Sequence, residues 1–348
     1  MLPKFSGAFG IGLVLLVGAA GPAAAVEPGD RLDRFRELAA SQLALAQVLD
    51  PDAPTEAYRE IYALLDDEIV ESLASGGPFA SLPFLQDRLD SFADAWGGAV
   101  LRLVRAGGFV VGAFVLADRP TGNSVRVYGG LGGEGPALLT AFYREGRPSV
   151  SVLPAGRNGA FVVAWEGPSS GWGTRPLRVD LLRATSDGVR VAWSTTEDFA
   201  DGLLARSWSV RGSDVRIRYE VRYPGWAPGC DGQTEQEDVY RVTPVAAVTR
   251  VARREHDGWH RQLHATVSRL MAALAAQDEA TLSSLVPDRT LRGRLPATLR
   301  PEPSCDGRVG AAGDAISVAA AADRQPWTLT FRRQGAGWRL TGATPVLQ

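Results

Sequence analysis

The spacing of apolar residues changes twice along the chain and divides it into three regions. In residues 26–98 apolar side chains recur every three or four positions, which predicts helices. Asp50-Pro51 is expected to end the first helix, while Thr55 and Ser81 are suited to cap the second and third. The three predicted apolar faces are Leu32, Phe35, Leu38, Leu45 and Leu49, then Tyr58, Ile61, Leu65, Ile69 and Leu73, then Leu82, Leu85, Leu89, Phe92 and Trp96.

Residues 99–250 replace the helical spacing with a period of two, which is typical of strands. The clearest case is 215–223, where Val215, Ile217, Tyr219 and every second residue after them share one face. Residues 109–117 are continuously apolar and predict a strand buried on both faces. About ten short strands separated by glycine-containing turns predict an antiparallel β domain, built as a single sheet, a sandwich or a partial propeller.

Residues 251–348 return to helical spacing and then form strands again. A long helix is predicted from its N-cap Asp257, and a second helix from its cap Asp278. Three strands are predicted at 315–321, 327–333 and 338–344, the last two joined as a hairpin by Gly335-Ala336-Gly337. The pattern as a whole predicts a multidomain α+β protein, with a helical segment, an antiparallel β domain and a C-terminal α+β domain.

The C-terminal region resembles a known family in its order of elements and in its tryptophan-bearing hairpin. Trp327-Thr-Leu-Thr-Phe331 and Gly337-Trp338-Arg339-Leu340 follow a long helix, so residues 257–346 are similar to the SnoaL-like or ketosteroid-isomerase-like α+β cone. The resemblance implies a curved sheet wrapped on a helix around a pocket, in a family where some members are enzymes and many only bind. Residues 251–348 contain no tyrosine, so the tyrosine that donates to the oxyanion in such isomerases is missing. Residues 1–250 resemble no family that we recognise.

Residues 1–25 have the features of a secretory signal peptide. Lys4 supplies positive charge, residues 9–20 are apolar, and Ala23-Ala24-Ala25 offers a cleavage site. The alternative is an uncleaved membrane anchor. Cleavage would leave a periplasmic or secreted protein with no membrane span. Lys4 is also the sole lysine, so a mature chain would hold no lysine for Schiff-base chemistry.

Charge and composition narrow the possible partners further. The formal net charge of −2 gives no general attraction to nucleic acid, and we assign no cofactor. The use of arginine in place of lysine, with abundant alanine and glycine, is typical of a GC-rich bacterial genome. Residues 27–97 carry 15 acids and 5 arginines, whereas residues 250–348 carry 14 arginines and 9 acids. The two ends could therefore dock on each other, or their charges could simply face solvent.

Cys230 and Cys305 are the only cysteines, and each begins the tripeptide Cys-Asp-Gly. In an oxidising compartment an even number of cysteines favours a disulfide. This disulfide would tie the C-terminal domain to the end of the β domain, and chain-entropy arguments give it up to about 4.5 kcal/mol. Two free thiols or a shared metal site are the alternatives.

All three histidines lie just after the β domain, at positions 256, 260 and 264. On one helix His260 and His264 would share a face and could bind a metal, although two ligands fall short of the three or four that zinc needs. They also continue the apolar stripe of their helix, which favours hydrogen-bonded residues at the edge of the core. Gly258 is expected to leave His256 in front of the helix. We therefore assign no metal site.

Four acidic residues are candidates for a site near the predicted disulfide. Asp231, Glu235 and Glu237 follow Cys230, and Asp306 follows Cys305. Paired carboxylates can act as acid and base or hold calcium, but the spacing does not match a twelve-residue calcium loop. The alternative is a polar turn that the disulfide stabilises.

Two glycine-containing stretches match catalytic motifs without the elements that those motifs need. Residues 167–171 fit G-x-S-x-G, but Gly173 and Pro176 follow where a nucleophile elbow requires a helix. Residues 130–135 fit G-x-G-x-x-G, but they lie among strands and not in a βαβ unit. We interpret both as loops and assign no catalytic residue.

These patterns favour an exported bacterial envelope protein that binds or scaffolds an unknown ligand or envelope protein without catalysis. The alternative is a secreted hydrolase or metal-dependent enzyme with its site where the β domain meets the C-terminal domain. One geometric criterion separates them. Either of His260 and His264 within about 5 Å of the Asp231, Glu235 and Glu237 carboxylates in an open cleft would favour the enzyme, and histidines buried among aliphatic side chains would oppose it.

Overall fold

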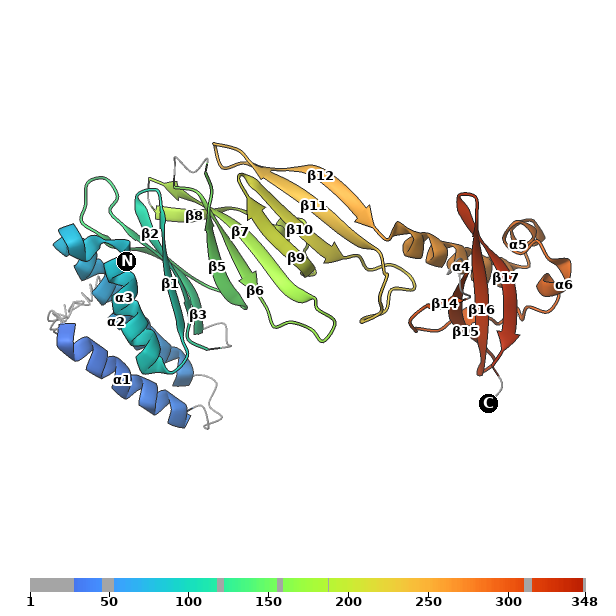
Figure 1. Cartoon of the computed structure of the whole chain (residues 1–348), viewed down its shortest axis with the longest axis horizontal. Coiled ribbons are helices and arrows are strands. Elements are labelled where there is room, and N and C mark those ends of the chain that lie inside the picture. Colours follow the sequence, from blue (N-terminus) through green and yellow to red (C-terminus); the bar gives the residue numbers. More distant parts are fainter. Residues whose placement is uncertain are drawn as a thin grey trace, which may run out of the picture.

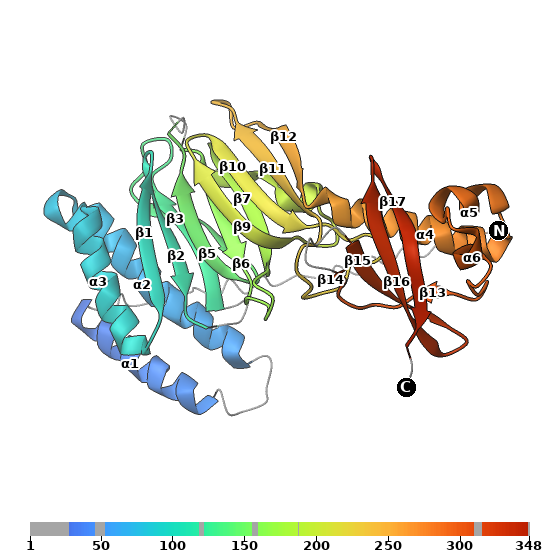
Figure 2. The same cartoon turned by 45° about the vertical axis from the view of Figure 1, so that its right-hand side comes forward.

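A computed structural model describes residues 28–45, 53–117, 122–154, 159–186, 188–309 and 315–346. The predicted signal peptide, Leu49 and Asp50-Pro51 lie outside these residues. The molecule is elongated, with three helices at one end, β-sheets in the middle and a small α+β module at the other end (Figure 1). Figure 2 shows the same order from a second direction. No helix in the described ranges is both long and apolar enough to cross a membrane.

The three helices are α1 (Pro28–Leu45), α2 (Ala53–Ser75) and α3 (Leu82–Trp96), with a short 3-10 turn η1 (Gly77–Ala80) before α3. Ser81 caps α3 as predicted, because its hydroxyl accepts from the amide of Phe84 at 3.4 Å. Gly97 ends α3 in the left-handed conformation, with φ of 81°. Thr55 lies inside α2 and not at its start.

The helices cover one face of a four-stranded antiparallel sheet and share a hydrophobic core with it. The strands follow chain order as β1 (Val100–Ala106), β2 (Phe109–Val115), β3 (Asn123–Gly129) and β4 (Ala137–Tyr143). Every residue of β2 and β3 is buried, which confirms the buried strand predicted from the apolar run. Phe35, Ile61 and Leu85 of the helices pack with Leu101 and Phe114 of the sheet.

An eight-stranded antiparallel sheet packs on the other face of the four-stranded sheet. Val111 and Val125 of the smaller sheet share a core with Phe161 and Val163 of the larger one. The strand order is β12-β11-β10-β9-β7-β6-β5, and β8 pairs with β7. The strands are β5 (Arg147–Val152), β6 (Phe161–Glu166), β7 (Arg175–Thr185), β8 (Gly188–Ser194), β9 (Leu204–Arg211), β10 (Asp214–Glu220), β11 (Glu235–Val242) and β12 (Val248–His256), with a short 3-10 turn η3 (Thr195–Glu197) after β8.

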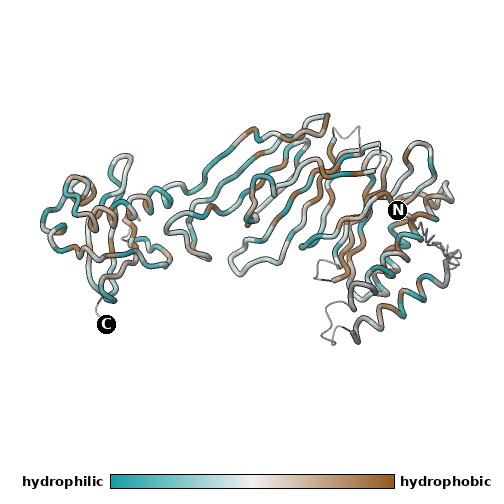
Figure 3. The backbone as a smooth tube through the Cα atoms, turned by 180° about the vertical axis from the view of Figure 1, so that it is seen from behind, coloured by the Kyte–Doolittle hydropathy of each residue, from teal (hydrophilic) through white to brown (hydrophobic). Residues whose placement is uncertain are grey.

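The antiparallel β organisation is confirmed, whereas the propeller alternative is wrong. The strands belong to two sheets stacked face to face through a common core, and not to blades arranged around an axis. Figure 3 shows apolar residues gathered beside the helices, while polar residues are frequent along the strands that lead to the C-terminal module. The edge strand β12 is largely exposed and carries Arg250, Arg253 and Arg254, and such charges discourage pairing with another chain.

The C-terminal module packs one long helix against a third antiparallel sheet. Leu263, Val267 and Leu270 of α4 share a core with Phe331 and Leu340 of the predicted hairpin, which is confirmed. Asp278 caps the second helix as predicted, accepting from the amide of Thr281 at 3.1 Å. The elements are α4 (Gly258–Ala276), α5 (Glu279–Leu285), α6 (Arg289–Arg292), β13 (Arg300–Pro301), β14 (Gly307–Val309), β15 (Ala315–Ala322), β16 (Gln325–Gln334) and β17 (Gly337–Pro345).

Three details differ from the sequence-based expectations. Strand β10 ends at Glu220, so Tyr223 lies in the following loop and not on the strand face. Asp257 occupies the N-cap position of α4, but its side chain makes no capping bond. The acidic helices do not dock on the C-terminal module, because they pack on the four-stranded sheet at the opposite end of the molecule.

Candidate functional site

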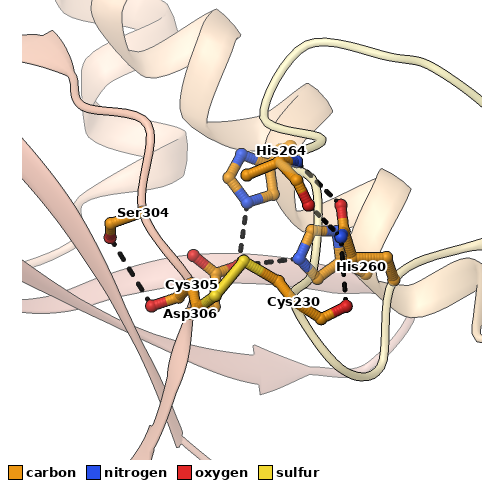
Figure 4. Close-up of a disulfide and its surroundings, with 8 residues drawn as sticks. Cys230, His260, His264, Ser304, Cys305 and Asp306 are labelled. Atoms are coloured by element: carbon orange, nitrogen blue, oxygen red, sulfur yellow. Dashed lines mark hydrogen bonds and ion pairs between the residues drawn. A yellow bond between two sulfur atoms is a disulfide. The ribbon is translucent and has the colours of Figure 1, made fainter. Parts of the chain in front are cut away.

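Three segments meet where the eight-stranded sheet gives way to the C-terminal module. These are the loop of residues 221–234 between β10 and β11, the first turns of α4, and the segment of residues 302–306 before β14. The predicted disulfide joins Cys230 of the first segment to Cys305 of the last, with their Cα atoms 5.1 Å apart (Figure 4). The free-thiol and cysteine-metal alternatives are therefore wrong.

His260 and His264 share one face of α4, as their spacing predicted, and both contact Asp306. The Oδ2 atom of Asp306 lies 2.8 Å from Nε2 of His264 and 3.1 Å from Nε2 of His260. The two imidazole rings stack with their centroids 4.7 Å apart. Both histidines are buried, at 2% and 5% exposure, beneath the disulfide-bearing loop. Figure 4 shows these side chains converging beside the disulfide.

Asp306 keeps its negative charge in this buried place because of the histidines. Burial by itself would raise the pKa of the Asp306 carboxyl, but hydrogen bonds from His260 and His264 outweigh that effect and hold it below the usual range. The Oδ1 atom of Asp306 has no hydrogen-bond partner within the described ranges. The carboxylate therefore depends on the two histidines for its stabilisation.

Tyr223 completes a chain of hydrogen bonds through His260, and the sequence analysis missed it. Its hydroxyl accepts from the amide of Thr234 at 3.0 Å and lies 2.6 Å from Nδ1 of His260. Because the amide donates to it, the Tyr223 hydroxyl is free to donate its own proton to Nδ1 of His260, which leaves the ring N–H on Nε2, where it donates to Asp306. Burial raises the pKa of Tyr223, opposed in part by the Thr234 amide, so the phenol keeps this proton. The Tyr223-Pro224-Gly225 turn signal could have placed it in a loop.

The loop sits on α4 through two further residues. Gly225 has a φ of 89°, and a Cβ added there would overlap the ring of His264, so both conformation and space require glycine. The Thr234 hydroxyl donates to the carbonyl of Asp257 at 2.7 Å and accepts from the amide of Arg261 at 3.1 Å. Thr234 thus satisfies a free amide at the start of α4, the role expected of the Asp257 side chain.

The remaining acidic candidates do not join this cluster. Glu235 pairs with Arg206 at 2.9 Å and also with Arg218. Glu237 lies 3.8 Å from His256, which ends β12 before the helix, as expected from Gly258. Asp231 is exposed. Of the four predicted acids, only Asp306 bonds to His260 or His264 in the described part of the chain.

The geometry does not meet the criterion for an enzyme, because the carboxylate beside His260 and His264 is that of Asp306 and the site is closed. The ligand atoms of His260, His264 and Asp306 lie within 4.8 Å of one another, which is a spacing that a metal ion could use. However, the side chains of His260, His264 and Asp306 are only 3%, 6% and 5% exposed, so this is not an open cleft. A cavity of about 610 Å³ lies instead on the β-sandwich and is lined by none of the three.

Neither catalytic motif has the structure that its chemistry needs. Residues 167–171 form a loop between β6 and β7, and Ser170 shares its hydroxyl with Thr174 at 2.9 Å. No helix follows this loop, so a nucleophile elbow is absent there. Residues 130–135 connect the antiparallel strands β3 and β4, which excludes a βαβ nucleotide site at that position.

Comparison with known proteins places the chain in no family. No model of a protein family matches it, and no curated protein matches it. A crystal structure of a protein from Lactobacillus plantarum matches at 11% sequence identity, covering 69% of each chain, with a TM-score of 0.20. Similarity at this level identifies neither a fold nor an activity.

Proposed function

We propose that this chain is an exported, non-catalytic protein of the bacterial envelope, in which the junction cluster has a structural role. The junction cluster consists of Tyr223, His260, His264, Asp306 and the Cys230–Cys305 disulfide. One observation carries the proposal: the two histidines that catalysis would need are buried and bonded within the protein.

The junction cluster is suited to fix the C-terminal module relative to the β-sandwich. The loop of residues 221–234 contacts α4 through His260, His264 and the backbone around Thr234, and the disulfide ties it to the segment before β14. A continuous chain from β12 into α4 adds a second connection. The result is a rigid elongated molecule whose two ends can hold partners at a set separation.

The export part of the proposal has two supports. Residues 1–25 carry the signal pattern, and the disulfide is compatible with an oxidising compartment. The role as a scaffold rests on the elongated shape, with the helical end and the C-terminal module far apart in Figure 1.

A metal-dependent enzyme is the second candidate, favoured by the clustering of His260, His264 and Asp306. It would use the two imidazole nitrogens and the carboxylate as ligands, with Tyr223 orienting His260 through Nδ1. The two candidates differ in what fills the space between the three side chains, either hydrogen bonds or an ion.

Metal analysis of the purified full chain tests the choice. We expect no stoichiometric transition metal after expression in zinc-supplemented medium, and a melting temperature that EDTA leaves unchanged. The matched pair is His264→Gln, inside the cluster, and His256→Gln, outside it. Under the structural role, only His264→Gln lowers the melting temperature, and neither variant changes the metal content. One metal ion per chain, lost in His264→Gln and retained in His256→Gln, would contradict the proposal and favour the enzyme.

A further inference from the structure

The charges of this elongated molecule have opposite sign at its two ends. Residues 27–97 carry 15 acids and 5 arginines, whereas residues 250–348 carry 14 arginines and 9 acids. The β-sandwich lies between the three helices and the C-terminal module (Figure 1), so the two ends of one molecule do not neutralise each other. Two copies placed end to end can bring the opposite charges together.

The acidic charge at the helical end is displayed on the outward side of α3. Asp87, Asp90 and Asp94 follow each other at spacings of three and four residues, so they share one side of the helix, and all three are exposed. Asp90 lies 3.6 Å from Arg102, while Asp87 and Asp94 make no ion pair with a described residue. Arg88 of the same helix bonds to α2 instead. This side of α3 therefore keeps an uncompensated negative charge.

An exposed aromatic side chain adjoins these carboxylates. Phe79 of η1 is 52% exposed and packs against Phe84 of α3, with the ring centroids 5.2 Å apart. Phe84 lies one turn before Asp87 on the same side of the helix. We define the docking face of α3 as Phe79, Phe84, Asp87, Asp90 and Asp94. It has an apolar end and an anionic end, and about 15 Å separate Phe84 from Asp94 along the helix.

The C-terminal sheet carries a row of similar length and opposite charge on the face turned away from α4 and the core. Val309 of β14 pairs with Ala315 of β15, and Ala315 pairs in turn with Arg332 of β16. Arg332 is paired directly with Arg339 of β17. Directly paired residues share one face of a sheet, and three strand spacings span about 14 Å. Val309 is 39% exposed and both arginines are exposed, so this arginine row also has an apolar end and a charged end.

The hairpin itself offers no acid to offset the positive charge of the arginine row. Strands β16 and β17 contain three arginines and no acid between Gln325 and Pro345. Asp314, which precedes β15 in the sequence, can offset one of them, which leaves the tip of the hairpin positive. Arg332 and Arg339 are like charges placed directly opposite each other, an arrangement that is destabilising in a sheet. Carboxylates supplied by another molecule would relieve this repulsion.

We propose that the docking face of α3 in one copy binds the arginine row of a second copy. The carboxylates meet the arginines, while Phe79 and Phe84 cover Val309. The contact joins two different surfaces of the same chain, so each copy keeps one surface of each kind available and copies can add head to tail. The inference rests on the proposed scaffold role and names the partner as a second copy of this chain. Exposed ion pairs are screened by salt, so the association is weak and reversible.

Sedimentation velocity of the full chain at increasing concentration tests the proposal. We expect species larger than a monomer to grow with concentration at about 20 mM salt and to disappear at about 500 mM salt, because exposed charges are then screened. Arg332→Glu/Arg339→Glu and Asp87→Arg/Asp94→Arg should each weaken self-association about tenfold or more. An equimolar mixture of the two variants should associate again, because each variant carries the surface that complements the other.

Arg269→Glu/Arg289→Glu is the control, because it makes the same change in net charge at exposed residues of α4 and α6, outside the arginine row. It should associate like wild type, and an equal loss in this control would overturn the inference. A wild type that stays monomeric at low salt up to about 100 μM would also overturn it. So would a mixture of the two variants that fails to associate although both melt like wild type. None of these results bears on the junction cluster, which metal analysis tests separately.

Discussion

His260 shows how the surroundings of one side chain decide whether a histidine is reactive or structural. Its Nδ1 atom meets the Tyr223 hydroxyl at 2.6 Å, and its Nε2 atom meets Asp306 at 3.1 Å. Both ring nitrogens are therefore occupied by the protein itself. A general base needs one ring nitrogen within reach of a substrate, which this arrangement does not leave.

Asp306 makes stability depend on pH in a predictable direction. Its pKa is lowered in the folded protein, so its contribution is fully present above the unfolded-state value near about 4 and is lost as pH falls through the folded-state value. Asp306→Asn should reduce the free energy of unfolding by about 2 kcal/mol at pH 7, because two hydrogen bonds lose their charged acceptor. Urea unfolding at pH 7, 5 and 3 measures this.

The difference between wild type and Asp306→Asn should shrink as the pH falls below about 4, because the carboxyl of unfolded wild type then binds a proton, which favours unfolding, whereas the asparagine does not titrate. Asp231→Asn is the control, since Asp231 is exposed and should change little at any pH. A difference that stays constant from pH 7 to pH 3 would show that Asp306 does not act through its charge.

At the scale of elements, buried ion pairs connect pieces that hydrophobic packing brings together. Arg126 of β3 donates to Asp66 of α2 at 2.6 Å and so links the helices to the four-stranded sheet. Asp238 of β11 is fully buried and accepts two bonds of 2.8 Å from Arg253 of β12. Burial would raise the pKa of Asp238, but the bonds from Arg253 and Tyr219 outweigh it and lower the pKa. Removing one partner of such a pair leaves an uncompensated buried charge.

The seating of the 221–234 loop on α4 can be tested with a matched pair of glycine substitutions. Gly225 and Gly212 both have positive φ, at 89° and 60°, but only Gly225 lies against another side chain, that of His264. Both Gly→Ala variants should lose about 1 kcal/mol to backbone strain. Gly225→Ala should lose about 1–3 kcal/mol more, because its Cβ displaces the imidazole. Equal losses in chemical denaturation would show that the loop does not rest on His264.

At the scale of the whole molecule, the shape depends on one narrow connection. The helices, the four-stranded sheet and the eight-stranded sheet form a continuous stack of shared cores, while the C-terminal module has a separate core. The connection between these bodies consists of the strand–helix passage at Asp257, the seated loop and the disulfide. The orientation of the C-terminal module relative to the β-sandwich therefore depends on the contacts at the junction.

Removing the disulfide should loosen this connection without unfolding the sandwich. The Cys230→Ser/Cys305→Ser variant should lose up to about 4.5 kcal/mol, because the bridge closes a loop of 75 residues. Small-angle scattering should show a broader distribution of dimensions for this variant than for the oxidised wild type. Reduced wild type is the chemical control and should match the variant. Unchanged scattering in both would show that the remaining contacts hold the module alone.

Local patterns in the sequence determined most elements of this protein. The apolar run at β2 reflects burial of both faces of that strand, and the alternation along β10 reflects burial of one face. Ser81 and Asp278 accept hydrogen bonds from backbone amides three residues further along the chain. The pairing of the two cysteines also followed from composition, because two cysteines allow a single intramolecular disulfide. The strands and caps depend on neighbours within a few residues, and the disulfide pairing depends on the number of cysteines in the chain.

Tertiary structure alone decided which side chains meet. Asp306 reaches the histidines across 42 positions of sequence, while the nearer Glu235 turns to Arg206 and Arg218. Tyr223 was predicted to lie on a strand face but lies in a loop, because β10 ends at Glu220. Asn123 and Trp165 reach the same cavity from different sheets. Such contacts depend on how the sheets stack and where the loops fold back. A periodic pattern in the sequence determines which face of a helix or strand a residue occupies, but it does not determine which residue it contacts.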